Sequence, residues 1–383
     1  MPGTGAQRPG QLFAGNDLLW RAHRAATAGD MALALQLRSA LPAGLAHTGH
    51  LLDANAAVVQ GDPARWRIGL NLYLARWRVA PVLLRKGRAP LLDRLHCAGL
   101  PPVPDGPKIS VILCAHNAAG TIAAATRSIL AQRWRNLELI AVDDASRDGT
   151  AGILHDLARA DPRLRVIANP VNVGPYVGRN IALGLATGDW ITVQDADDWS
   201  HPERLSRHLR SVLKSASPPP VSAVGMLRMT PEGRFSQIRV VGGESLDGVL
   251  QHAPMSPLFA ADFLKGKLGS WDCAHFGSDS ELMARAEALT GHPAPRLEQF
   301  SLIALDHPGS LTGNPLTGVH PDFGLSPARR AYKRAWRRWQ ARALTPDTAF
   351  LAFPPGPDRF ARPAAAQVER GSIDQAIRSI DSL

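Results

Sequence analysis

The sequence predicts an α/β fold in which a mixed, mostly parallel sheet lies between helices, preceded by a helical region. Two observations support this. Four apolar runs of strand length follow one another, and helical patterns are expected at 121–132, after Gly149 and at 177–186 between them. Polar clusters stand directly behind the runs, where a right-handed crossover sheet gathers them at the carboxyl ends of its strands. The runs are 109–114, 137–142, 163–168 and 190–193.

The composition is that of a globular chain of two or three domains. The chain has 383 residues, 45% of them hydrophobic and 20% charged. No run of about eighteen uncharged apolar residues occurs, so no membrane-spanning helix is expected. Residues 1–11 lack the apolar core of a secretory signal and are expected to be a disordered lead-in, which makes a cytoplasmic location the default expectation. Cys97, Cys114 and Cys273 fit neither a disulfide framework nor a metal knuckle and are expected to be inert thiols.

The chain divides into a helical region, a linker, a central domain and a tail. We expect helices at 12–100, a Pro-rich linker at 101–107, the central domain at 108–325 and the tail at 326–383. Residues 66–77 carry an apolar stripe at helical spacing. The helices around Gly29 resemble one tetratricopeptide hairpin, but a cap or docking module is favoured because no period is visible. Within the central domain, 221–241 alternates like strand, with Gly233 in a turn.

The net charge of +10 favours an anionic partner. Nucleic acid is an unlikely one, because the excess is concentrated in the tail and no base-reading module is visible. Residues 329–342 predict an amphipathic helix with Tyr332, Trp336 and Trp339 on one face and arginines around them. Such a helix suits an anionic membrane surface at the cytoplasmic face of the inner membrane. The alternative, equally favoured, packs the aromatic residues on the body of the protein and leaves the basic face in solvent.

Two acidic clusters follow predicted strands. Asp195 and Asp197 stand on either side of Ala196 after the fourth run, and one of these carboxylates can meet the sugar or ribose while the other holds a divalent cation. A surface turn is the alternative, and an EF-hand is excluded because Ser200 stands where its glycine would be. Asp144 follows the second run and suits a base or ribose, whereas Ser146 or Asp148 can simply cap the next helix. Neither a dinucleotide-binding glycine motif nor a Walker loop occurs.

Four ordered motifs together resemble the family 2 glycosyltransferases of the GT-A fold over about ninety residues. They are Ile-Ser-Val-Ile-Leu-Cys-Ala-His-Asn at 109–117, Val-Asp-Asp-Ala-Ser-Arg-Asp-Gly-Thr at 142–150, Asn-Val-Gly through Gly-Arg-Asn at 172–180, and Asp-Ala-Asp-Asp at 195–198. The segments 66–84 and 199–202 are also similar to a bacterial subgroup tied to surface polysaccharide synthesis. Two departures occur: Gly178 replaces the common alanine, and His116 replaces the usual tyrosine of the first motif.

The resemblance implies an inverting transferase that uses a nucleotide-diphospho-sugar, with a UDP-sugar favoured, and Mn²⁺ or Mg²⁺. By matched position, Asp144 would hold the nucleobase, Asp195 the ribose or sugar side, and Asp197 the metal. The remaining residues that the resemblance assigns to the donor site are Asn117, Ser146, Arg179 and Asn180. His307 lies where related transferases have a segment that closes over the diphosphate, and with Asp195 it is a further candidate for the metal shell.

The candidate catalytic base is Asp279, with Glu281 as the fallback. In the resembled family a Gly-x-Asp at the start of a late helix takes the proton of the acceptor hydroxyl, and Asp279 matches it within 277–279. An N-cap role for Ser278 or Asp279 is the structural alternative.

We therefore expect a metal-dependent inverting glycosyltransferase acting on a glycan or lipid-linked glycan in surface polysaccharide synthesis. The competing expectation is a catalytically silent nucleotide-sugar-binding scaffold of a glycan-assembly complex. The sequence does not identify the sugar, the acceptor or the linkage.

Overall fold

The computed structural model of the protein describes residues 9–238, 245–253, 256–314, 316–320 and 324–380. The chain forms two compact units. The first comprises Met1–Leu100, Gly225–His252 and Glu298–Asp306, and the second comprises Pro101–Val224, Ala253–Leu297 and His307–Leu383. The second unit thus begins at the predicted linker. Residues 225–252 and 298–306, which we expected within the central domain, cluster with the N-terminal residues instead.

The first unit begins with helices, as expected. Helix α1 packs on α2 and α3 on α4, and Trp66, Leu70 and Tyr73 of the predicted stripe are buried. Asp30 and Asp62 accept hydrogen bonds from the first backbone N–H groups of α2 and α4, which explains where these helices begin. The elements of this part are α1 (Pro9–Thr27), α2 (Met31–Ser39), η1 (Ala46–Thr48), α3 (Gly49–Val59), α4 (Pro63–Ala75), β1 (Leu83–Leu84), α5 (Leu91–Arg94) and β2 (Leu95–His96).

The helices of the first unit pack on its later segments through specific hydrogen bonds. Trp66 donates from Nε1 to the Gly233 carbonyl at 2.7 Å and stacks on Phe235. The Tyr73 hydroxyl and His47 Nε2 each lie 2.9 Å from Asp247 Oδ2. The expected turn is present, because Gly233 has a φ of +99° and its N–H donates to the Thr230 carbonyl. The strands are β8 (Val221–Met229, which begins in the second unit), β9 (Gln251–His252) and β11 (Arg296–Leu305).

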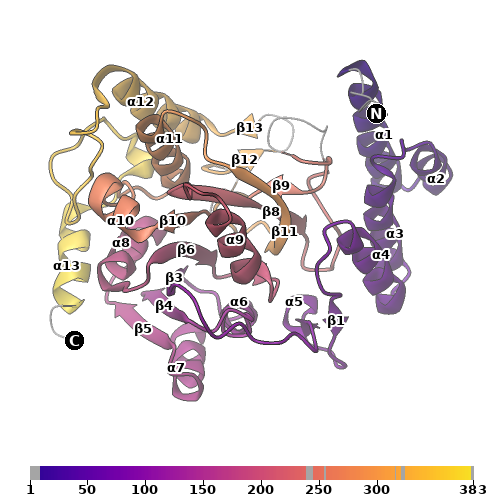
Figure 1. Ribbon diagram of the computed structural model, residues 1–383, viewed down its shortest axis with the longest axis horizontal. Helices are drawn as coiled ribbons and strands as arrows, with labels where there is room; N and C mark the ends of the chain where they lie inside the picture. The colour runs from indigo at the N-terminus through magenta and orange to yellow at the C-terminus, as the bar shows by residue number, and fades with distance from the viewer. Residues whose placement is uncertain (1–8, 239–244, 254–255, 315, 321–323, 381–383) are drawn as a thin grey trace. The chain divides into compact units, whose positions relative to one another are not determined.

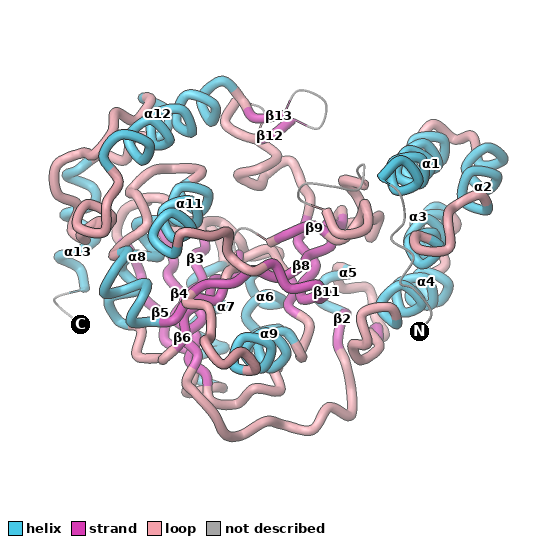
Figure 2. Tube along the Cα trace, turned by 45° about the horizontal axis from the view of Figure 1, so that its top comes forward, coloured by secondary structure: helices cyan, strands magenta, loops and turns pink. Residues whose placement is uncertain are grey.

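The second unit contains the predicted sheet. Strands β5, β4, β3 and β6 are parallel neighbours, and β10 and the start of β8 extend them antiparallel, which confirms the mixed, mostly parallel sheet (Figure 2). The strands of this unit are β3 (Ile109–Ala115), β4 (Leu137–Asp144), β5 (Leu164–Asn169), β6 (Trp190–Asp195), β7 (Trp199–Ser200), β10 (Leu258–Ala260), β12 (Val319–His320) and β13 (Gly324–Leu325).

Helices cover both faces of this sheet (Figure 1). Alternate residues of β3 point to opposite sides, so Val111 packs with α6 and α9, whereas Ile112 packs with α8, α11 and α13. Because helices cover both faces, the strands are buried on both sides, which explains their continuous apolar runs. The helices are α6 (Ile122–Leu130), α7 (Thr150–Ala160), α8 (Pro175–Leu185), α9 (Arg204–Leu213), α10 (Ala261–Phe263), η2 (Leu264–Leu268), α11 (Ser278–Thr290), α12 (Pro327–Ala343), η3 (Ala364–Ala366) and α13 (Arg370–Ile380).

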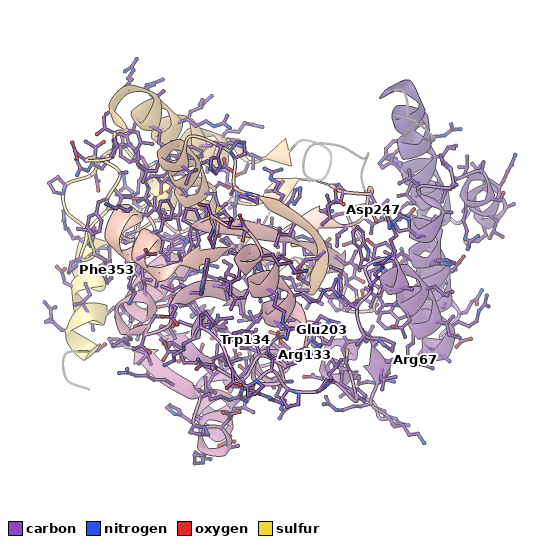
Figure 3. All side chains as sticks on the ribbon, in the orientation of Figure 1. Arg67, Arg133, Trp134, Glu203, Asp247 and Phe353 are labelled. Carbon is purple, nitrogen blue, oxygen red and sulfur yellow. The ribbon has the colours of Figure 1, made fainter. Side chains whose placement is uncertain are left out.

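An ion pair ties the segment before β4 to the start of α9. The guanidinium of Arg133 lies 3.2 Å from a carboxylate oxygen of Glu203, and its backbone N–H donates to the Pro202 carbonyl (Figure 3). Both side chains are largely buried, so this contact fixes the chain that follows the acidic cluster after β6.

Candidate active site

The carboxyl ends of the parallel strands bring the predicted motifs together. In the register of the sheet, Cys114 of β3 pairs with Asp195 of β6, and Ala115 pairs with Asp143 of β4. Asp144, the last residue of β4, pairs with Asn169 of β5. The acidic clusters after β4 and β6 therefore lie on either side of the end of β3, at one edge of the sheet.

Arg179 joins two of the predicted site residues. It lies on α8, and its guanidinium contacts Asp279 Oδ1 through Nη1 at 2.5 Å and Asp195 Oδ1 through Nη2 at 2.8 Å. The arginine side chain is almost fully buried, and it lies over the ring of Tyr176. Burial alone would lower the pKa of Arg179, but the two carboxylates outweigh it and raise the pKa. The guanidinium therefore stays charged, and it links the end of β6 to the start of α11.

Asp279 is held by three donors in the first turn of α11. Besides Arg179, the Tyr176 hydroxyl donates to Oδ2 at 3.0 Å and Trp271 Nε1 donates to Oδ1 at 3.2 Å. Gly277 precedes the helix with a φ of +84°, a backbone conformation that favours glycine. Within the described part of the chain no side chain caps the start of α11, and the side chain of Asp279 is 16% exposed. The carboxylate is thus oriented by fixed partners and still reaches solvent.

Tyr176 and Trp271 were not among the predicted site residues. Tyr176 stands three residues before Arg179 on α8, so the helical spacing could have placed both on one face. Trp271 comes from the segment before α11, and no local sequence pattern predicts its place at the site. Burial raises the pKa of the Tyr176 hydroxyl, and the neighbouring Asp279 carboxylate adds to the effect. The hydroxyl therefore stays protonated and remains a donor to Asp279.

Asp144 organises the turn before α8. Its carboxylate accepts from the backbone N–H groups of Val173 and Gly174 and from the side-chain amide of Asn169, at 2.7–3.2 Å. Burial raises the pKa of the Asp144 carboxyl, although these hydrogen bonds act to lower it. The adjacent Asp143 is also buried, and its Oδ1 has no hydrogen-bond partner among the described residues. The contacts of Asp144 are structural ones, and its assignment to the nucleobase stays a prediction.

The loops after β3 and β4 are bonded to each other through Asn117. This residue has a φ of +50°, its N–H donates to Ser146 Oγ at 2.9 Å, and its side-chain carbonyl accepts from Arg147 N. Asp148 accepts from Thr150 N at 3.0 Å and so assists the start of α7. The helix-starting role considered for this cluster therefore belongs to Asp148, whereas Ser146 holds the neighbouring loop.

His116, which departs from the family pattern, also takes part in this contact. Its Nδ1 lies 2.7 Å from the Asp144 carbonyl oxygen, and its Nε2 lies 3.0 Å from Asn117 Nδ2. The imidazole thus bridges the ends of β3 and β4, and this placement gives the substitution a structural reason.

Asp197 and His307, two of the residues predicted for the metal shell, are adjacent. His307 Nε2 lies 2.9 Å from Asp197 Oδ2, and both side chains are about a quarter exposed. Among the residues that the structure describes, no group of three or more His, Cys, Asp and Glu side chains is arranged around one point. A carboxylate with an imidazole still suits Mn²⁺ or Mg²⁺, since these ions keep waters and take oxygen atoms from substrate phosphates. Asp195 contacts Arg179 through Oδ1, and its assignment to the metal stays a prediction.

Asn180 is placed as a structural residue. Its side chain forms two 2.9 Å hydrogen bonds with the backbone of Trp271, one donated and one accepted, and it is buried. This pairing holds the segment that carries Trp271 against α8. These contacts orient a partner of Asp279, and the contact of Asn180 with the donor stays a prediction.

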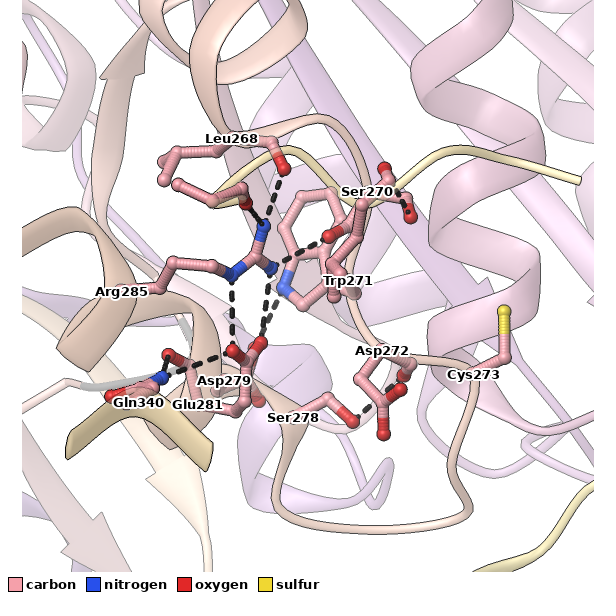
Figure 4. A network of polar contacts seen from close by, with 12 residues as sticks. Leu268, Ser270, Trp271, Asp272, Cys273, Ser278, Asp279, Glu281, Arg285 and Gln340 are labelled. Atoms are coloured by element: carbon pink, nitrogen blue, oxygen red, sulfur yellow. Dashed lines mark hydrogen bonds and ion pairs between the residues drawn. The ribbon is translucent and has the colours of Figure 1, made fainter. Parts of the chain in front are cut away.

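Glu281 lies in the interior, which argues against the fallback base. Both of its carboxylate oxygens contact the guanidinium of Arg285 at 3.0 Å, and both side chains are fully buried (Figure 4). Gln340 of α12 donates a further hydrogen bond to it. A carboxylate in this position cannot meet an acceptor hydroxyl, so we correct the expectation and retain Asp279 alone. The period of α11 explains the difference, because two residues along a helix point to nearly opposite sides.

Gly178 departs from the family pattern for a steric reason. A Cβ at this position would lie 2.9 Å from Cys114 Sγ, closer than such atoms normally approach. The glycine therefore accommodates a cysteine at the end of β3. Burial raises the pKa of the Cys114 thiol and keeps it protonated, in agreement with an inert role.

The comparisons with known proteins find similarity in the central segment. Residues 110–224 match the model of glycosyl transferase family 2. The succinoglycan biosynthesis protein ExoO of Rhizobium meliloti (strain 1021) is 32% identical over 209 residues, which are 51% of this chain and 60% of that protein. The chain thus spans less than two thirds of that relative.

A second relative is named for its reaction. The UDP-Glc:alpha-D-GlcNAc-diphosphoundecaprenol beta-1,3-glucosyltransferase WfaP of Escherichia coli is 35% identical over 101 residues, 26% of this chain and 39% of that protein. Among solved structures, S. aureus TarS 1-349 in complex with UDP-GlcNAc superposes with a TM-score of 0.45 at 19% identity, covering 59% of this chain and 64% of that chain. Within the described residues, no helix combines the length and apolar character that crossing a bilayer requires.

Proposed function

We propose that the protein is an inverting glycosyltransferase of surface polysaccharide synthesis, because residues 110–224 match the model of glycosyl transferase family 2. The donor would be a nucleotide-diphospho-sugar, with a UDP-sugar favoured, and the acceptor a hydroxyl of a glycan or lipid-linked glycan. The observation that carries the proposal is the shared contact of Arg179 with Asp195 and Asp279. It ties the acidic motif after β6 to the candidate base.

The proposed reaction is a single displacement. Asp279 takes the proton of the acceptor hydroxyl while that oxygen attacks the anomeric carbon of the donor sugar. The bond between this carbon and the diphosphate oxygen breaks, and the nucleoside diphosphate leaves with the electron pair. Attack from the side opposite to the leaving group inverts the anomeric centre. Tyr176 and Trp271 would keep the carboxylate turned towards the acceptor through their hydrogen bonds to it.

The donor would be held at the ends of β3, β4 and β6. Asp144 and Asn117 are proposed for the nucleobase side and Asp195 for the ribose or sugar. Asp197 and His307 would hold a divalent cation, which supplies positive charge to the departing diphosphate. The donor preference is supported by WfaP, whose name specifies a UDP-linked sugar.

A lipid-linked acceptor is part of the same proposal. The name of WfaP specifies an acceptor joined to diphosphoundecaprenol, and ExoO is named for the synthesis of a polysaccharide. The proposal therefore keeps the protein in the cytoplasm at the inner face of the membrane, where such an acceptor would be reached.

The test is Asp279→Asn, which keeps the shape of the side chain and removes the base. With a panel of UDP-sugars and Mn²⁺, we expect UDP release to fall by about 10²- to 10⁴-fold. The rise of the thermal midpoint on adding UDP and Mn²⁺ should remain, since ligand binding to the folded state is unaffected. Asp197→Asn should instead abolish the part of this rise that depends on Mn²⁺.

The matched control is Asp262→Asn, which changes an exposed aspartate of α10 in the same unit. It should leave both readouts unchanged. Release of UDP by Asp279→Asn within threefold of the parent rate would remove Asp279 from its proposed role. Binding of the donor by the parent protein without any release or transfer would favour the scaffold alternative.

A further inference from the structure

Helix α12 has a row of exposed arginines on one face. The helix contains no aspartate or glutamate. Among the described residues, none of the side chains in this row forms an ion pair. They recur at the spacing of a helix surface and form what we call the α12 basic face: Arg330, Arg334, Arg337, Arg338 and Arg342.

The opposite face of α12 is part of the protein core. Tyr332, Trp336 and Trp339 are buried in one cluster, together with Ala274, Phe276, Phe360 and Ala366. The sequence left open whether these aromatic residues enter a membrane or pack on the body, and the structure places them in the body. The aromatic side chains of this helix are therefore not available to insert into a bilayer. Because they pack in the core, the arginines on the opposite face point towards solvent.

We propose that the α12 basic face docks on the surface of an anionic lipid bilayer by charge alone. The inference rests on the proposed function, because a lipid-linked acceptor is presented at such a surface. The row runs along the helix from Arg330 to Arg342, a rise of about 18 Å, and can lie along a flat array of headgroups. Lys and Arg near an anionic bilayer each add to binding, even without apolar insertion.

The same face is a poor match for nucleic acid. Single-stranded binders alternate cations with exposed aromatic rings on which bases stack. All three aromatic side chains of α12 are buried, so the exposed face offers only charge.

Docking through this face would place the proposed base near the membrane. Gln340 of α12 donates to the backbone carbonyl of Glu281 at 3.2 Å, and the Tyr332 hydroxyl lies 3.2 Å from Ser278 Oγ. Both contacts reach the first turns of α11, where Asp279 lies. The docked helix and the base-bearing helix are thus held together by packing, so the orientation of one at a surface sets the orientation of the other.

The test is vesicle flotation with the full chain. We expect binding to vesicles of 30% phosphatidylglycerol in phosphatidylcholine, and none to pure phosphatidylcholine. Replacing Arg330, Arg334, Arg337 and Arg338 by glutamine should weaken binding by about fivefold per arginine, and so at least about a hundredfold together. Raising the salt to 0.5 M should release the parent protein, because screening shortens the range of the attraction.

The matched control removes four other exposed cations of the same unit by Arg127→Gln, Arg165→Gln, Arg210→Gln and Lys214→Gln. Its net charge is the same, and it should bind within about threefold of the parent protein. Equal binding of both charge-reduced proteins, or equal binding of the parent to both lipid mixtures, would overturn the proposal. So would binding to poly(dT) that the α12 variant loses while vesicle binding is absent.

A separate readout distinguishes this proposal from the proposed function. UDP release from a UDP-sugar without vesicles should be the same in the parent protein and the α12 variant, since no arginine of the α12 basic face contacts Asp279. Loss of flotation with normal UDP release supports docking. Absence of UDP release in every form would count against the proposed function, whereas the flotation result would still decide the docking.

Discussion

At the scale of single residues, Arg179 has the contacts with the most consequence for function. Its planar guanidinium is bonded at the same time to Asp195 and Asp279, one carboxylate from each of two separate motifs. A single ammonium cannot reproduce this forked geometry. The residue acts on the base by holding its carboxylate, and we therefore regard it as a positioning residue.

We expect Arg179→Lys to lower kcat for UDP release by about 100-fold, because a carboxylate displaced by about an ångström loses its alignment with the acceptor. The KM for the donor should rise far less, since we propose that the nucleotide is held at the ends of β3 and β4. Steady-state rates with a UDP-sugar and Mn²⁺ measure both constants. Arg165→Lys on the exposed face of β5 is the control. A variant whose kcat stays at the parent value would show that the bridge is dispensable.

The sequence predicted the members of this site better than their individual contacts. The ordered motifs placed Asp144 and Asp195 in one site, because strand ends converge at one edge of a parallel sheet, and the resemblance added Asp279 at the start of a late helix. They did not indicate that the side chain of Asn180 holds the backbone of Trp271, and its assignment to the donor stays a prediction. Which partner an amide or carboxylate chooses depends on segments distant in the chain, and local patterns carry no information about them.

At the scale of elements, the tail is bound to the segment before α11. Asp272 is buried, and it accepts from the Tyr332 hydroxyl of α12 at 2.7 Å and from Arg362 Nε at 2.9 Å. The carbonyl of Asp272 accepts from Ser278 at the start of α11 (Figure 4). The tail lies outside the segment that matches the family, but these contacts help to fix the helix start that carries Asp279.

We expect Arg362→Met to destabilise the second unit by about 3 kcal/mol, because it leaves the carboxylate of Asp272 buried without its cation. Denaturant unfolding followed by tryptophan fluorescence measures the change. UDP release should fall as well, since the start of α11 loses support.

Arg359→Met removes an exposed arginine three residues away and should cost less than about 0.5 kcal/mol. Adding Asp272→Asn to Arg362→Met should recover part of the loss, because the buried charge is then gone. A full 3 kcal/mol loss in the Arg359 variant as well would show that the ion pair is not the cause.

The sequence predicted which segments form helices and strands better than it predicted what packs against them. The strands β3 to β6 and the helices α6, α8 and α12 lie close to the ranges expected from periodicity. The alternating pattern of 221–241 suggested a strand with one exposed face, but every residue of β8 is buried. Residues 239–241 lie outside the described part of the chain. Similarly, the pattern of α12 fixed its aromatic face but did not indicate what covers that face.

At the scale of the whole molecule, the division into units follows contacts that composition does not reveal. Residues 225–252 and 298–306 join the N-terminal residues through pairs such as Trp66 with Gly233 and Tyr73 with Asp247. Each pair joins residues more than 160 positions apart in the chain. Periodicity is a local property, and so it predicts the helices of the first unit but not the strands on which they pack.

The stability of the second unit should depend on pH through one buried histidine. His208 on α9 is buried, its Nε2 lies 2.9 Å from Ser222 Oγ, and burial together with the Arg204 guanidinium lowers its pKa to about 3. The folded protein therefore keeps this imidazole neutral, whereas the unfolded chain binds a proton near its ordinary value of 6.5. Above pH 6.5 neither state is protonated there. Below that value the unfolded state binds the extra proton, so stability falls.

Between pH 7.5 and pH 5.5 this histidine should cost about 1.4 kcal/mol of the free energy of unfolding, since the unfolded state is then protonated about ten to one. Urea unfolding at the two pH values measures the difference. His208→Gln should lose that part of the pH dependence, although it will be less stable at pH 7.5 because the shape of the buried side chain changes. His155→Gln, an exposed position on α7, should keep the parent dependence. If His208→Gln and the parent protein lose the same free energy on acidification, His208 is protonated in the folded protein and its proposed neutrality is wrong.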